Sequence, residues 1–115
     1  MAACWHHPNA TAGEACVIIV MGSFRLPIEN FDSALPMMEK VIAATRAEDG
    51  CLLYAYSRDT IDPGLVRVSE QWRDRAALDA HFRTQHMKVW AEERAALGLT
   101  ERDIRVFEAD EGVAV

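Results

Sequence analysis

Four side chains in the second half of this chain are spaced so that they could carry out proton-transfer chemistry. Glu70 and Trp72 stand two residues apart near the end of an alternating apolar run, and His81 and His86 follow soon after. Imidazole and carboxylate groups are common general bases and acids in enzymes. The same residues also fit a structural interpretation, in which a core tryptophan lies near two histidines with satisfied hydrogen bonds.

Aromatic side chains flank this group on both sides. Tyr54 and Tyr56 belong to the preceding apolar run, while Phe82 and Trp90 follow His81. Alternation places Glu70 and Trp72 on one face of a strand, and helical spacing places His81 on an apolar face of the next helix. These side chains converge on one region, and on periodicity alone a role in the core is the favoured interpretation. If the region is instead a pocket, its catalytic candidates are Glu70, Trp72 and His81, and its candidate substrate contacts are Tyr54, Tyr56, Phe82, His86 and Trp90.

The common cofactor and metal motifs are absent from the sequence. We find no GxGxxG or P-loop pattern, no GxSxG elbow, no HExxH helix and no CxxC pair. On one continuous helix His81 and His86 would point about 140° apart, so they could share a metal ion only if the helix broke near Thr84. We therefore expect neither a metal ion nor a cofactor.

Composition bounds the class of protein. The 115 residues suffice for one domain, and the net charge of -6 disfavours binding to nucleic acid or to an anionic membrane. No apolar run approaches the roughly 18 residues of a membrane span. Residues 1–15 lack the basic and hydrophobic regions of a secretory signal, so we expect a flexible tail there, a domain over residues 16–115 and a cytoplasmic protein.

Hydrophobic periodicity predicts the elements that position the candidate site. We expect a strand over 16–26, a helix that Asp32 or Ser33 caps, with Pro36 near its first turn, and a left-handed Gly50 that closes it. Two alternating runs, 51–57 and 65–72, predict a hairpin, with Leu52, Tyr54 and Tyr56 on one face.

A second helix follows, which Asp74 caps, and Thr84 caps a further helical segment; residues 103–109 close the sheet. This β-α-β-β-α-β order is that of an α+β, ferredoxin-like protomer. Its helices cover one face of the sheet, so we expect a second copy to cover the other in a homodimer.

Residues 47–87 resemble the antibiotic biosynthesis monooxygenase family, in particular its quinol-monooxygenase-like members. The resemblance lies in the segment "EDGCLLY", the "DP" turn, the strand end "EQW" and the helix "ALDAHF", which is followed by a second histidine. It implies a dimeric α/β barrel that oxidises a phenolic or quinol-like small molecule, of the polycyclic type that members of known activity use, with O2 and with neither flavin nor metal.

The resemblance also implies roles for the candidate residues. His81 would act as base or proton relay, Trp72 as pocket wall and hydrogen-bond donor, and Glu70 would orient its neighbours. A dimeric barrel that binds a small hydrophobic ligand without catalysis, in a stress or regulatory role, is the alternative. Haem degradation, which related proteins perform, fits less well because the first strand lacks the asparagine that those proteins use.

Overall fold

The computed structural model describes residues 16–115, and the predicted tail over residues 1–15 lies outside the described residues. The elements follow in the order β1 (Val17–Arg25), α1 (Phe31–Arg46), β2 (Cys51–Arg58), β3 (Leu65–Trp72), α2 (Arg75–Phe82), α3 (Gln85–Ala96) and β4 (Thr100–Ala109). A short 3-10 turn, Ile28–Asn30, precedes α1. No helix in this part of the chain is long and apolar enough to cross a membrane.

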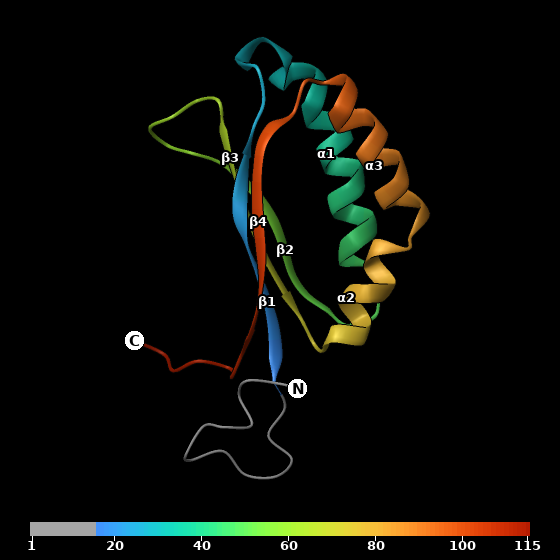
Figure 1. Ribbon diagram of the computed structural model, residues 1–115, viewed down its shortest axis with the longest axis vertical. Coiled ribbons are helices and arrows are strands. Elements are labelled where there is room, and N and C mark those ends of the chain that lie inside the picture. The colour runs from blue at the N-terminus through green and yellow to red at the C-terminus, as the bar shows by residue number, and fades with distance from the viewer. Residues whose placement is uncertain (1–15) are drawn as a thin grey trace.

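The four strands form one antiparallel sheet in the order β2-β3-β1-β4. The helices lie against one face of this sheet, with α1 and α3 side by side and α2 near one end (Figure 1). This arrangement confirms the predicted α+β, ferredoxin-like protomer.

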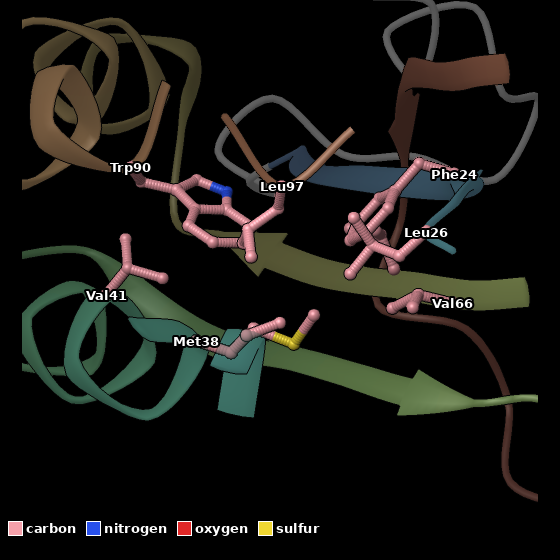
Figure 2. Close-up of a cluster of buried hydrophobic side chains, with 9 residues drawn as sticks. Phe24, Leu26, Met38, Val41, Val66, Trp90 and Leu97 are labelled. Carbon is pink, nitrogen blue, oxygen red and sulfur yellow. The ribbon is translucent and has the colours of Figure 1, made fainter. Parts of the chain in front are cut away.

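The main core fills the space between the sheet and the α1–α3 layer. It includes Phe24, Leu26, Met38, Val41, Val66 and Trp90, all at most 7% exposed. Figure 2 shows the Trp90 indole projecting from α3 among side chains from α1 and from the sheet. A second cluster packs Ile18, Val20, Tyr54 and Trp72 against Ala77 and Leu78 of α2. This second cluster anchors α2, and with it His81, to the sheet.

Two local predictions are wrong. The first helix begins at Phe31, where Asn30 occupies the cap position without a side-chain hydrogen bond, so neither Asp32 nor Ser33 caps it and Pro36 lies inside the helix. The 3-10 turn continues directly into α1, which moves the start of the helix upstream. Leu52 does not share the buried face of Tyr54: the β2–β3 register shifts between Cys51 and Leu53, and Leu52 is 55% exposed.

Other local predictions are confirmed. The Asp74 carboxylate accepts a hydrogen bond from the Ala77 backbone N–H at 2.8 Å and so caps α2. Gly50 has a φ of 84°, in the left-handed region that favours glycine. Thr84 occupies the cap position of α3, although its hydroxyl donates to the His81 carbonyl and not to a backbone N–H of α3.

Candidate active site

A cavity of about 180 Å³ lies between the sheet and the α2–α3 layer. Its floor is one cross-strand row, because strand register aligns Tyr54 with Glu70, Glu70 with Val20, and Val20 with Val106. All four of these side chains line the cavity. His81 and Phe82 of α2 and Met87 and Trp90 of α3 form much of its opposite wall. The lining therefore combines aromatic and aliphatic side chains with one carboxyl group, one imidazole and two guanidinium groups.

His81 is held in place by contacts with the sheet and with the turn that precedes β2. The side chain is 1% exposed, and its ring lies 4.7 Å from the Trp72 ring and 5.4 Å from the Tyr54 ring, measured between centroids. Its Nδ1 lies 2.8 Å from Oε2 of Glu48. Because a carboxylate accepts, this contact assigns the proton of the neutral ring to Nδ1 and leaves Nε2 as an acceptor.

We infer that the Nε2 atom of His81 faces the cavity, because Nδ1 is bound to Glu48. Within residues 16–115, the Thr45 hydroxyl oxygen is the side-chain polar atom that is both fully buried and without a hydrogen-bond partner. His81 Nε2 also has no hydrogen-bond partner among these residues. Since it is not fully buried in this way, it must be accessible from the cavity that its side chain lines. Burial lowers the pKa of His81, and the hydrogen bond to Glu48 opposes this. A neutral imidazole that can take up a proton is therefore directed into an aromatic cavity.

Glu70 is a buried carboxyl group on the cavity floor. Its side chain accepts a 2.9 Å hydrogen bond from Nε1 of Trp72. Burial raises the pKa of Glu70 to about 7, against the weaker lowering effects of the Trp72 hydrogen bond and the Arg102 charge. The group therefore occurs in both protonation states near neutral pH and can donate as well as accept.

The predicted site residues are distributed as follows. Glu70, His81, Tyr54, Tyr56, Phe82 and Trp90 line the cavity. Trp72 is fully buried and does not line the cavity, so its predicted place in the wall is wrong; its Nε1 donates a hydrogen bond to Glu70, which does line it. His86 lines a separate groove between α1 and α3 and contacts the cavity residue His81 through Glu48.

Tyr54 and Tyr56 form a linked pair of hydroxyl groups. Their oxygens are 2.8 Å apart, and burial raises the pKa of both phenols, so each stays protonated. Their rings stand 5.4 Å apart, and the Tyr56 ring lies 6.0 Å from that of Trp90. These rings provide flat apolar surfaces with polar hydroxyl groups within the cavity.

Three polar residues of the site escaped the sequence analysis. Glu48 lies in the turn between α1 and β2, where an acidic residue has no distinguishing pattern. Arg94 and Arg102 line the cavity from α3 and β4, and among residues 16–115 neither has a salt-bridge partner. Burial, with the nearby charge of Arg102, lowers the pKa of Arg94. Helical and strand periodicity could have predicted that both arginines lie near the cavity. It could not have predicted that they lack salt-bridge partners.

Comparisons with known proteins show which family this chain is similar to. The model of the antibiotic biosynthesis monooxygenase family matches residues 17–93. The Escherichia coli protein named "Probable quinol monooxygenase YgiN" is 31% identical over 85 residues, which cover 66% of this chain and 80% of that protein. An uncharacterised Synechocystis protein is 27% identical over 94 residues, and the matched part is 64% of its length.

Solved structures give the same result. A "putative antibiotic biosynthesis monooxygenase" from Deinococcus radiodurans superposes with a TM-score of 0.80 at 28% identity, over 85% of this chain and 97% of that one. A conserved protein from Methanosarcina mazei superposes with a TM-score of 0.76 over 84% of this chain and 96% of that one; at 22% identity it supports the fold alone.

Proposed function

This chain belongs to the antibiotic biosynthesis monooxygenase family, and we propose that it oxidises a small quinol or phenol with O2 without a cofactor. The observation that carries this proposal is the His81 imidazole, which Glu48 binds at Nδ1 while its Nε2 is open to the aromatic cavity. Such a pair resembles the base and its orienting carboxylate in other enzymes. The similarity to a protein named a probable quinol monooxygenase supports the same substrate class.

The chemistry needs few protein groups. His81 Nε2 accepts the phenolic proton, and the electron-rich phenolate reduces O2 directly. For a phenol with a C–H bond in the para position, one oxygen atom becomes a second carbonyl and the other leaves as water. For a quinol with a ring C–H bond, one oxygen atom enters at that carbon as a hydroxyl group, both quinol hydroxyl groups become carbonyls, and the other oxygen atom leaves as water. The substrate carbon skeleton supplies all four electrons, and its O–H and C–H hydrogens complete the water molecule. No external reductant is required.

The other cavity residues fit roles in this scheme. Glu70 donates or accepts a proton near neutral pH, and Trp72 holds its carboxyl group in place. Tyr54, Tyr56, Phe82 and Trp90 would contact the substrate ring, and His86 would act on it indirectly, through Glu48. Arg94 and Arg102 bring positive charge to the cavity, which would stabilise a phenolate.

The volume of the cavity limits the size of the substrate. An apolar cavity of about 150 Å³ accommodates one benzene ring, and the cavity here measures about 180 Å³. A singly ringed, substituted quinol therefore fits without rearrangement. A polycyclic substrate would have to move Phe82, which lines the cavity and is 50% exposed.

The test is O2 uptake by metal-free protein with a series of reduced quinols, each rate corrected for autoxidation. We expect His81→Ala to abolish the enzymatic part of the rate, since general bases contribute about 10²- to 10⁴-fold. Arg75→Ala, on the exposed side of the same helix, is the matched control. Equal uptake by wild-type protein and His81→Ala would refute the role of His81. Quinol binding without uptake would favour a non-catalytic binding protein.

We also propose that the protein is a homodimer that pairs through the sheet face without helices. Alternation directs Met21, Leu53 and Phe107 away from the helix layer, and they are 57%, 45% and 49% exposed. Exposed apolar side chains clustered on one face are typical of an interface. Light scattering should give twice the mass of the chain, and Met21→Asp should reduce it to that of the monomer.

A further inference from the structure

We propose that Glu48, His81 and His86 form a binding site for one divalent transition-metal ion behind the aromatic cavity. The three ligand atoms, Glu48 Oε2, His81 Nδ1 and His86 Nε2, all lie within 4.8 Å of one another. Two imidazole nitrogens with one carboxylate oxygen form a donor set that suits Zn²⁺ and its first-row neighbours. Mg²⁺ and Ca²⁺ prefer sites made of oxygen atoms.

A break between two helices brings the histidines together. The helix α2 ends at Phe82, and α3 begins at Gln85. The Thr84 hydroxyl donates to the His81 carbonyl at 2.8 Å and stabilises the turn. The helix thus breaks near Thr84, which is the condition under which the sequence allowed the two histidines to share an ion. The rings lie 6.2 Å apart between centroids, and both contact the same carboxylate oxygen.

The spacing of the ligand atoms is close to that of a metal site. Glu48 Oε2 lies 2.8 Å from His81 Nδ1 and 2.7 Å from His86 Nε2. An ion with bonds of about 2.1 Å in tetrahedral geometry holds its ligands about 3.4 Å apart. The carboxylate would therefore retreat by less than about 1 Å as the ion replaces the two imidazole protons, and the two imidazole nitrogens, which lie within 4.8 Å of each other, would approach by up to about 1.4 Å through side-chain rotation.

Solvent reaches this site without passing through the cavity. The side chains of His86 and Glu48 are 23% and 13% exposed, whereas that of His81 is 1% exposed. His86 lines the groove between α1 and α3, and Glu48 lines a separate hollow beside α2. The ion would have three protein ligands and at least one position open to water. Among residues 16–115, both ion-pair partners of Glu48 are these histidines, so no arginine or lysine competes for it.

Metal binding would change whether His81 Nε2 accepts or donates a hydrogen bond in the cavity. An ion on Nδ1 displaces the proton that this nitrogen donates to Glu48, and the neutral ring then carries its proton on Nε2. The Nε2 atom would donate a hydrogen bond and could no longer accept the phenolic proton. Zn²⁺ would therefore inhibit the oxidation. This consequence rests on the proposed function, whereas metal binding itself does not.

The binding test is a competition between the full-length protein and a chromophoric chelator for Zn²⁺, with Co²⁺ absorption as a second readout. We expect one ion at this site, with an affinity that falls at least about 10- to 100-fold in His86→Ala, the loss that even an indirect change brings. Glu93→Gln, in the same groove, is the control. His86→Gln keeps an amide donor toward Glu48 and serves if His86→Ala fails to fold. Each variant is also measured with His6→Ala and His7→Ala, because those histidines could bind Zn²⁺ independently.

The outcomes separate this inference from the proposed function. The metal site would be overturned if the protein bound Zn²⁺ with equal affinity whether His86 was present or replaced by Ala or Gln, whatever the enzyme activity. A metal site that depends on His86 in a protein that oxidises no quinol would support the site and count against the proposed function. If the protein does oxidise a quinol, Zn²⁺ should inhibit the parent at concentrations at least about tenfold lower than His86→Gln.

Discussion

Replacing Glu70 by Gln should stabilise the protein at alkaline pH and leave its stability nearly unchanged at acidic pH. The carboxyl group is 8% exposed on the cavity floor and accepts a hydrogen bond from Trp72 Nε1. A glutamine oxygen can accept the same hydrogen bond without a charge. The substitution therefore removes the burial of the ionised form and keeps the local contact.

The magnitude follows from the pKa of Glu70, which burial raises from 4.5 to about 7. Between these values the folded protein keeps a proton that the unfolded chain has lost. The stabilisation from this group is thus complete below pH 4.5 and is lost as the pH rises through about 7. At about 1.4 kcal/mol per pKa unit, the full difference is about 3 kcal/mol.

Other charges near Glu70 modify this value in known directions. Arg102 lowers the pKa of Glu70 and Glu48 raises it. Arg94 and His81 line the same cavity. Since Glu70→Gln leaves all four residues in place, the difference between wild-type protein and variant isolates the titration of Glu70 itself.

The assay is urea unfolding followed by tryptophan fluorescence, at about pH 5 and about pH 8.5 and at a fixed protein concentration. The advantage of Glu70→Gln should grow by about 2 to 3 kcal/mol between the two pH values. Glu39→Gln, an exposed carboxyl group on α1, should show no such change. Parallel pH profiles for Glu70→Gln and wild type would refute the reasoning and show that the cavity floor is well hydrated.

Three further substitutions test how the site is supported. Trp72→Phe removes the donor to Glu70; leaving a buried acceptor without its partner should cost about 1–3 kcal/mol in urea unfolding and raise the pKa of Glu70 further. Gly50→Ala should cost more than about 1 kcal/mol of unfolding free energy, because φ is 84° and the new Cβ would lie 2.6 Å from Cβ of Ala77. Adding Ala77→Gly should relieve the clash between the two Cβ atoms but not the backbone strain. Leu78→Ala, at a fully buried position that anchors α2, should cost about 2–5 kcal/mol, measured as a lower urea midpoint.

Periodicity predicted those parts of the fold that depend on a repeating pattern. The alternation in β3 gave the buried face that Val66, Val68, Glu70 and Trp72 share, and the structure buries all four. It failed where one residue broke the repeat. The extra residue at Leu52 is a register shift, which depends on how β2 meets β3 and has no signature within β2.

The sequence predicted site residues that lie on helices and strands, but not the site residue that lies in a turn. His81 followed from the helical stripe after Asp74, and its burial is confirmed. Glu48, which fixes the tautomer of His81, is separated from it by 33 residues and lies outside any helix or strand. Contacts between a turn and a helix so distant in sequence depend on how the elements pack, so local spacing could not identify this partner.

The cost of burying Glu70 itself argues for function at this position. A valine there would continue the apolar stripe of Val66 and Val68. It would also avoid the loss of roughly 3 kcal/mol of folding stability that the ionised carboxyl group causes at alkaline pH. A carboxyl group with a pKa near neutrality adds little to packing, but it can exchange a proton with a ligand in the adjoining cavity. His81 departs from the apolar pattern of α2 in the same way. Both polar departures face one cavity, as expected where the demands of a site override those of a core.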